Sequence, residues 1–230
     1  MFVAIDGAVK KPGTAECLSV GCALFVDGLT STENLYKILC EPYGSTSQRG
    51  EINGLKLALT EAVNAEMHDD VLIILTDSQY LHDTVMNEWV QKWAAAGWIS
   101  ASGEPPKNVD QWKDIYDLLN KLSDKNVEVT MVWTKGHLYT YPAGQITRCM
   151  QHDATGATLM NSINTMLGVA TQRDRAVEAF NSYRAEHALP PLPANIAADY
   201  ILYNCTVDGI AVYCANLLKA HADAQSVGNK

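Results

Sequence analysis

The segment VLIILTDSQYL, residues 71–81, decides the fold, because an uninterrupted apolar run ends in Thr76, Asp77 and Ser78 before a helical pattern begins. A run of Val, Leu and Ile without polar alternation is typical of a central strand buried on both faces. Ligands of open α/β sheets bind outside the carboxyl ends of such strands. Asp77 is therefore a candidate site residue, although an Asp at this position is equally typical of a helix N-cap.

Two more acidic residues stand at the ends of expected elements. The chain begins with MFVAIDG, in which a short apolar run ends in Asp6. The segment QRGEINGLKLALTEAV, residues 48–63, has apolar residues at helical spacing and carries Glu51 in its first turn. Glu51 is also explained by the favourable interaction of an acid with the helix dipole. The patterns give three candidate carboxylates without showing that they meet.

Three later segments carry a family resemblance. LTDSQYLHDTVMNEWVQKWAAAGW at 75–98, KNVDQW at 107–112 and VWTKGH at 132–137 follow one another in an order and spacing that resemble the core of type 1 ribonuclease H. The resemblance covers about residues 1–155. It implies that metal ions bind to the carboxylates Asp6, Glu51 and Asp77, and that a loop histidine, His137, moves protons or helps to release product.

The resemblance and the strand patterns together predict the fold class. Apolar segments at 17–28, 34–40 and 127–133 add three strands, with a hairpin turn at Asp27 and Gly28. We expect an α/β protein with a ribonuclease H-like mixed five-stranded sheet, three antiparallel strands followed by two parallel ones, flanked by helices. Helical segments are expected near 79–96 and 109–123.

The resemblance ends near residue 158, and this sets the predicted domain boundary. Residues 1–158 are predicted to form the catalytic domain and residues 159–230 a helical C-terminal extension packed on it. Within the extension we expect helices near 159–187, 194–204 and 208–224, with a turn at Val207, Asp208 and Gly209 between the last two. The extension is open to three interpretations: a homodimer interface, a duplex-binding lobe or simple reinforcement.

Length and composition agree with a globular protein. The 230 residues, 47% of them hydrophobic, suffice to bury a full core. The sequence has no uninterrupted apolar run of the roughly 18 residues typical of a membrane span and no signal-peptide pattern, which predicts a cytoplasmic protein without membrane contact. The six cysteines form neither C-x-x-C pairs nor a short disulfide framework, so we expect mostly buried thiols.

The charge is unusual for a protein that binds nucleic acid. Residues 1–155 hold 12 Lys and Arg against 20 Asp and Glu, a balance of −8, whereas proteins that bind phosphate backbones are usually basic. Two divalent ions would offset part of this charge, and Lys10 with Lys11 forms a local basic cluster. We therefore expect weak, metal-dependent binding.

A fourth carboxylate departs from the family pattern. The family places an aspartate about ten residues after the loop histidine and directly behind a cysteine, but here Met150 follows Cys149. The nearest acid is Asp153, three residues later, which on a helix lies one turn along nearly the same face. Asp153 is the predicted fourth metal ligand; the alternative is an acid favoured by a helix dipole.

The resemblance also implies substrate contacts. Hybrid duplexes are recognised through minor-groove shape and 2′-hydroxyls, so sequence specificity should be low. The segment AAAGWISASGE, residues 94–104, lacks the basic cluster typical of the helical handle in bacterial members. The predicted contact residues are Lys11, Thr46, Gln48, Gln79, Trp89 and Lys107.

The resulting functional prediction is a metal-dependent endonuclease that cuts the RNA strand of RNA–DNA hybrids, as in primer removal during DNA replication. Two Mg²⁺ ions, with Mn²⁺ as a substitute, would support a two-metal mechanism that leaves 3′-hydroxyl and 5′-phosphate ends. The alternative is a degenerate module that binds a hybrid or a protein partner without cutting. A lesser alternative is a nuclease of the same fold that cuts DNA.

Overall fold

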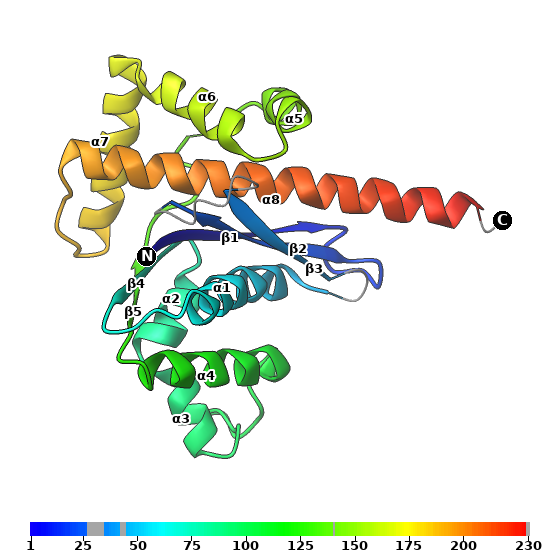
Figure 1. Cartoon of the computed structure of the whole chain (residues 1–230), viewed down its shortest axis with the longest axis vertical. Helices are drawn as coiled ribbons and strands as arrows, with labels where there is room; N and C mark the ends of the chain where they lie inside the picture. Colours follow the sequence, from blue (N-terminus) through cyan, green and yellow to red (C-terminus); the bar gives the residue numbers. More distant parts are fainter. Residues whose placement is uncertain (27–34, 42–44, 140, 229–230) are drawn as a thin grey trace.

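The chain folds around a mixed five-stranded sheet of order β3-β2-β1-β4-β5 (Figure 1). The computed structural model describes residues 1–26, 35–41, 45–139 and 141–228; the predicted turn at Asp27 and Gly28 lies outside these residues. β1 pairs antiparallel with β2, and β2 antiparallel with β3, whereas β4 is parallel to both β1 and β5. This confirms the predicted α/β fold. The strands are β1 (Phe2–Lys10), β2 (Leu18–Phe25), β3 (Tyr36–Glu41), β4 (Val71–Thr76) and β5 (Glu128–Trp133).

Helices cover both faces of this sheet. The predicted helical segment near 79–96 is divided at Asn87 and Glu88, where Glu88 adopts a left-handed backbone conformation with φ of 57°. The segment near 159–187 is likewise divided around Gly168. The helices are α1 (Ser47–Asn64), α2 (Gln79–Met86), α3 (Trp89–Ala95), α4 (Val109–Ser123), α5 (Ala143–His152), α6 (Ala157–Leu167), α7 (Ala170–Glu186) and α8 (Ala194–Gly228).

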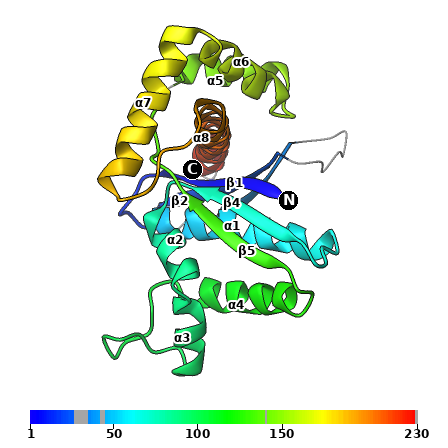
Figure 2. The same cartoon turned by 90° about the vertical axis from the view of Figure 1, so that its left-hand side faces the viewer.

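Alternation along β1 separates two apolar cores. Val3 and Ile5 pack with α1, α2 and α4 on one face, while Ala4 and Ala8 pack with α8 on the other. Figures 1 and 2 show α1 and α8 on opposite sides of the sheet. Because side chains alternate along a strand, Asp6 falls on the face that α8 covers.

Glycines allow α1 to lie unusually close to β1 and β2. A Cβ on Gly7 would lie 2.4 Å from the backbone nitrogen of Glu51, and a Cβ on Gly21 would lie 2.4 Å from that of Gly54. Both distances are too short for any side chain, so only glycine fits at these strand positions. The close contact fixes the first turn of α1, and with it Glu51, against β1.

α8 is one continuous helix, so the predicted turn at Val207, Asp208 and Gly209 is wrong. Val207 and Ile210 are fully buried, and burial outweighs the weak helix propensity of Asp and Gly. Gly209 faces α5 and α6, where a Cβ would lie 3.2 Å from Leu159 Cδ2. The glycine permits a close helix crossing and does not end the helix.

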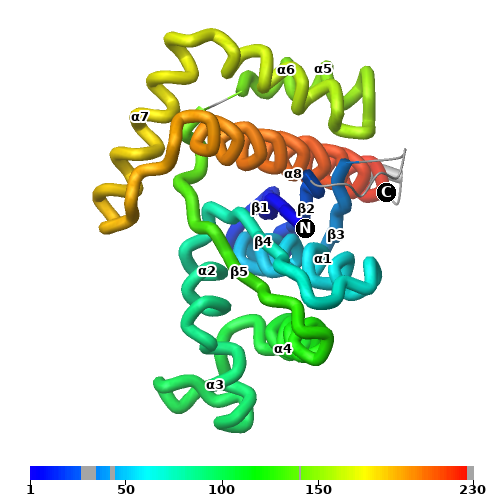
Figure 3. Tube along the Cα trace, turned by 60° about the vertical axis from the view of Figure 1, so that its left-hand side comes forward, coloured from blue at the N-terminus to red at the C-terminus, as the bar shows by residue number. Residues whose placement is uncertain are grey.

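The C-terminal helices share one core with the sheet. Phe180, Ile201 and Ile210 belong to the same buried cluster as Ala4 and Leu24. Figure 3 shows the chain leaving β5, forming α5, α6 and α7, and returning as α8 across the sheet. The predicted domain division at residue 158 therefore does not coincide with a break in packing, and α8 completes the second face of the sheet.

The length and composition of α8 would also suit a membrane span. Its segment Ala194–Ser226 has a mean hydropathy of 1.3 over its most apolar window, and 61% of that window is buried inside the protein. Contacts with β1 and β2 thus account for much of its apolar character. Toward the C-terminus α8 extends past α5 and α6 (Figure 1), and Leu217 there is 53% exposed. The homodimer contact through these helices stays a prediction.

We predict that Gly21→Ala lowers the free energy of unfolding by about 1–3 kcal/mol, the usual cost of overpacking, because the new methyl group would force α1 away from the sheet. Urea unfolding measures this change. The control is Gly144→Ala in the first turn of α5, where a Cβ meets nothing within 4 Å. Equal stability of the two variants would show that α1 does not depend on this close contact.

Candidate functional site: a carboxylate cluster

Asp6 and Asp77 are neighbours because their strands are parallel and in register. The last residue pair between β1 and β4 joins Ala4 to Leu75, and each aspartate lies two residues further along its strand direction. Burial raises the pKa of Asp6 well above 3.8, and the charges of Asp77, Asp208 and Glu51 raise it further. Burial likewise raises the pKa of Asp77. The structure thus brings together the three acids predicted from the sequence.

Glu51 reaches the cluster from the first turn of α1. Burial raises its pKa, a hydrogen bond with Ser78 lowers it, and the charge of Asp77 raises it again. Ser78 is also the N-cap of α2, where its hydroxyl accepts a hydrogen bond from the backbone N–H of Leu81. Ser78, and not Asp77, is therefore the N-cap of α2, and the Asp77 carboxylate is available to the cluster.

Asp208, in the middle of α8, is the fourth carboxylate of the cluster. Burial raises its pKa, whereas the charge of His137 and a hydrogen bond from Asp6 lower it. Asn204 lies one helical turn earlier, is only 5% exposed, and lowers the pKa of Asp77 through its side chain. Its Nδ2 atom still has no well-aligned hydrogen-bond acceptor. α8 therefore contributes an acid and an amide to the site from the face opposite α1.

The loop after β5 closes the remaining side. Gly136 passes directly over Asp77, so that a Cβ there would lie 2.1 Å from Asp77 Oδ2. His137 follows in a left-handed conformation with φ of 57°, and its Nδ1 lies 3.7 Å from Asp208 Oδ2. The imidazole is 73% exposed. A glycine before the histidine is thus required for the loop to approach the acid and present the ring to solvent.

The structure does not bring Asp153 to the cluster. α5 ends at His152, and Asp153 continues in extended conformation with φ of −146°. Its carboxylate accepts hydrogen bonds from the backbone N–H groups of Thr155 and Thr158, at 2.9 and 3.1 Å. Hydrogen bonds with the side chain and backbone of Thr155, and then with Thr158, lower its pKa to about 2. The expected shift of one helical turn therefore fails because the helix stops, and Asp153 instead links α5 to the first turn of α6.

The sequence patterns do not predict Asp208 as a site residue, because the family pattern places the fourth acid about ten residues after the loop histidine. About seventy residues separate the loop from Asp208, and α5, α6 and α7 occupy that interval. The spacing of Asn204 and Asp208 could have indicated a site. They are four residues apart in an apolar segment, so on a helix they share one face, and polar groups that are buried together need polar partners.

The donor set suits a hard divalent cation. Carboxylate oxygens are the ligands that Mg²⁺ and Ca²⁺ prefer, and positive charge would stabilise ionised Asp6, whose pKa is raised by burial and by the charges of Asp77, Asp208 and Glu51. The hydrogen bond between Asp6 and Asp208 marks a point where an ion can replace a proton. Within the described part of the chain, no three acid, His or Cys side chains are placed to hold one ion. An ion could be held here only if the carboxylates moved closer together.

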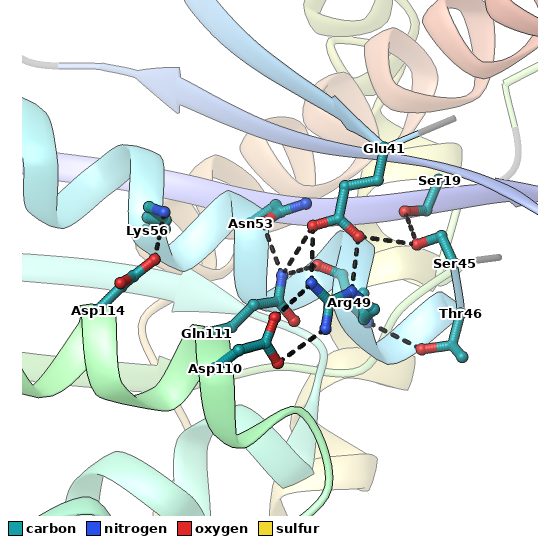
Figure 4. Close-up of polar contacts among 10 residues, drawn as sticks. All are labelled: Ser19, Glu41, Ser45, Thr46, Arg49, Asn53, Lys56, Asp110, Gln111 and Asp114. Atoms are coloured by element: carbon teal, nitrogen blue, oxygen red, sulfur yellow. Dashed lines mark hydrogen bonds and ion pairs between the residues drawn. The ribbon is translucent and has the colours of Figure 1, made fainter. Parts of the chain in front are cut away.

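A polar network holds the first turn of α1 (Figure 4). The Arg49 guanidinium donates to Glu41 Oε2 at 2.7 Å and to Asp110 Oδ2 at 2.8 Å, which ties α1 to β3 and α4. Although burial raises the pKa of Glu41, the hydrogen bonds from Arg49 and Asn53 lower it overall. Gln111 donates to Asn53 Oδ1 at 2.7 Å. Two residues after Arg49 comes Glu51, so this network fixes the base of the site.

The predicted substrate-contact residues lie on several elements around the cluster. Thr46 is the N-cap of α1, where its hydroxyl accepts from the N–H of Arg49, and Gln48 is exposed beside it. Gln79 is exposed at the start of α2, directly after the strand end that carries Asp77. Trp89 is 38% exposed at the start of α3. Their contact with substrate stays a prediction.

The two lysines of that set differ in environment. Lys107 is exposed in the loop before α4. Lys11 lies after β1 and forms ion pairs with Glu16 and, at 4.0 Å, with Asp223 of α8. Trp93, which shares a face with Trp89, packs edge-on against the buried Trp112 with ring centroids 5.9 Å apart. Lys11 is therefore held in acidic surroundings, and Trp93 is a packing residue.

The strand order, the carboxylate in the middle of β1 and the carboxylate directly after β4 define a ribonuclease H-like protein. A model of the RNase H family matches residues 1–145, and the chain belongs to this family. The match ends before α6, α7 and α8 begin.

Two sequence relatives named ribonuclease H support the same assignment. Ribonuclease H of Paracidovorax citrulli is 36% identical over 94 residues, which cover 41% of this chain and 58% of that protein. Ribonuclease H of Hahella chejuensis is 34% identical over 133 residues, covering 57% of this chain and 78% of that protein. Among solved structures, the RNase H domain of PFV aligns with a TM-score of 0.44 at 23% identity, covering 60% of this chain and 81% of the domain.

We predict that Asp6→Asn stabilises the metal-free protein increasingly as pH rises. A carboxyl whose pKa is raised by folding contributes stability below its unfolded pKa, near 3.8, and loses that contribution as pH rises through the folded pKa. Asparagine does not ionise, so the variant does not lose stability in this way as pH rises. Urea unfolding in EDTA between about pH 4 and about pH 8 tests this, with exposed Asp117→Asn as the control. A variant less stable than the wild type at the upper pH would contradict the repulsion.

We predict that Arg49→Met lowers the free energy of unfolding by about 1.5–3 kcal/mol, because Glu41 loses its charged hydrogen-bond partner in a half-buried setting. The matched control is Lys56→Met, which removes the 2.5 Å ion pair with the exposed Asp114 (Figure 4) and should cost less than about 1 kcal/mol. Chemical denaturation compares the two. Equal losses would mean that the Arg49 network is no more than a surface ion pair.

Proposed function

We propose that the protein is a metal-dependent endonuclease that hydrolyses the RNA strand of RNA–DNA hybrids and leaves 3′-hydroxyl and 5′-phosphate ends. One observation carries this proposal: carboxylates from α1, α8 and the end of β4 lie around the buried Asp6 of β1, and their charges add to the effect of burial in raising its pKa. Such a cluster is costly to the fold unless it holds cations. The family membership supplies the class of substrate.

The residues that would hold the ions are Asp6, Glu51, Asp77 and Asp208. Two Mg²⁺ ions, or Mn²⁺ in their place, would activate the attacking water and stabilise the departing oxygen of a phosphodiester. Asp6 is the natural shared ligand, because Asp77, Asp208 and Glu51 all act on its pKa. Asp208 replaces Asp153 as the fourth ligand in this proposal, since only Asp208 lies in the cluster.

His137 is suited to proton movement at the rim. Its ring is exposed, faces Asp208 across 3.7 Å and sits in the loop that Gly136 brings over Asp77. An exposed imidazole held beside a carboxylate can exchange protons between solvent and the site. We assign it to proton transfer or product release. Asn204, whose buried amide has an unused donor in the site, is suited to orient Asp77 or a substrate oxygen.

Binding of the duplex would rest on few cations. The net charge is −9, and the handle segment between Trp89 and Lys107 carries Lys92 as its one basic residue. Because phosphate contacts supply much of the affinity for nucleic acid, we infer weak binding that depends on the metal ions. The exposed polar groups at the starts of α1 and α2, Gln48 and Gln79, are the proposed minor-groove contacts. We place this activity in the cytoplasm, on hybrids that arise in DNA replication.

We predict that Asp208→Asn lowers hybrid cleavage more than about a hundredfold, because loss even of an outer-shell partner of a metal ligand commonly costs ten- to hundredfold. Asp153→Asn should leave cleavage nearly unchanged. The measurement uses end-labelled RNA–DNA hybrid, duplex RNA and duplex DNA with Mg²⁺ and then Mn²⁺.

Asp77→Asn serves as the inactive reference in that experiment. Cleavage of RNA in the hybrid alone, lost in Asp77→Asn and Asp208→Asn, would support the proposal. Binding of hybrid without cleavage by the wild type would favour a module that binds and does not cut. Cleavage of duplex DNA would instead assign the DNA-cutting alternative.

A further inference from the structure

Helix α7 lies outside the region that matches the RNase H family, yet it contacts the strand end beside the site. Trp133, the last residue of β5, has its ring centroid 5.3 Å from that of Tyr183 and 4.7 Å from that of His187, both on or next to α7. The Trp133 indole N–H donates to the carbonyl oxygen of Asp77 at 3.2 Å. Figures 1 and 3 show α7 beside the end of β5. The helix therefore abuts the residues that deliver Asp77.

Tyr183 also holds a cation at this edge. The Nζ atom of Lys135 lies 5.3 Å from the centroid of the Tyr183 ring, within the range of a cation–π interaction. Lys135 is exposed, and among the residues that the structure describes it forms no ion pair. The next residue, Gly136, passes over the Asp77 carboxylate. The lysine amine is thus ordered beside an acidic cluster without being neutralised by it.

An ordered lysine is useful at this place. A phosphodiester that approaches four carboxylates meets like charge, and a nearby ammonium group offsets that repulsion. A lysine side chain loses much rotamer freedom when it binds an anion, so a ring that holds it beforehand reduces this loss. Tyr183 offers the face of its ring and, through Trp133, is packed on the same strand that leads to Lys135.

We propose that Tyr183 is a positioning residue, which holds Lys135 so that its amine contacts a phosphate of the nucleic-acid substrate next to the carboxylate cluster. The proposal rests on the proposed function for the substrate class. It adds a role for the helices between β5 and α8, because α7 brings the ring to the site. The ring face carries the interaction, and the tyrosine hydroxyl is not required.

The test is a double-mutant cycle on hybrid binding and cleavage. Tyr183→Leu should raise KM for the hybrid about two- to fivefold, the range of an exposed cation–π contact, with kcat unchanged. Tyr183→Phe should behave like the wild type. Lys135→Gln should raise KM at least as much, reduce the slope of log affinity against log salt by about one, and abolish any further effect of Tyr183→Leu. Ser182→Ala, exposed on the same helix, is the control.

Binding is measured separately by fluorescence anisotropy with Ca²⁺ in place of Mg²⁺, so that failure of cleavage and failure of the lysine contact are distinguishable. Hybrid binding with no cleavage by the wild type would overturn the proposed function and leave the cycle valid. Additive effects of the two substitutions, or a change in kcat with KM unaltered, would overturn the role of Tyr183, as would absence of hybrid binding. If Tyr183→Leu lowers the thermal unfolding midpoint, Tyr183→Met takes its place.

Discussion

The burial of Asp6 between the sheet and α8 is the constraint on which the structure depends. Alternation along β1 sends Val3 and Ile5 to the α1 face and Asp6 to the α8 face, where the neighbouring strand residues Ala4 and Ala8 belong to an apolar core. A buried carboxylate costs free energy unless it is paired or coordinated. Here its neighbours are three more acids, so the cluster opposes folding in the absence of cations. Contacts elsewhere in the fold must therefore offset the free energy that the cluster costs.

That stability comes from rigid contacts around the cluster. Glycine positions allow α1 to rest on β1 and β2 at backbone distance, and Arg49 ties its first turn to β3 and α4. On the other face, α8 buries an apolar stripe against β1 and β2 along several turns. Neither helix can move away without losing a core, so Glu51 and Asp208 remain near Asp6 despite their repulsion. The placement of charge is therefore a consequence of packing.

Local signals in the sequence were sufficient for the sheet and for three of the four acids. Strand ends, helix starts and the resemblance identify Asp6, Glu51 and Asp77, because each lies within a few residues of a strong apolar pattern. The role of Asp208 is not predictable from local sequence, because an Asp–Gly pair is typical of a turn. Only the tertiary burial of Val207 and Ile210 makes this segment helical. Proximity in sequence to His137 favours Asp153, but its carboxylate accepts hydrogen bonds from the backbone N–H groups of Thr155 and Thr158 at the start of α6.

The helices α5, α6 and α7 separate the His137 loop from Asp208 in the sequence, and α7 also contributes side chains next to the site. α8 returns across the sheet and places Asp208, and on the way to it the chain forms α7, which lies beside the end of β5 (Figure 3). Beside the end of β5, aromatic contacts join Trp133 to Tyr183 and His187, and the Tyr183 ring lies 5.3 Å from Lys135 Nζ. An acidic protein without a basic handle has few Lys and Arg side chains that can contact phosphate. It follows that ordering one lysine at the site matters more here than it would on a basic surface.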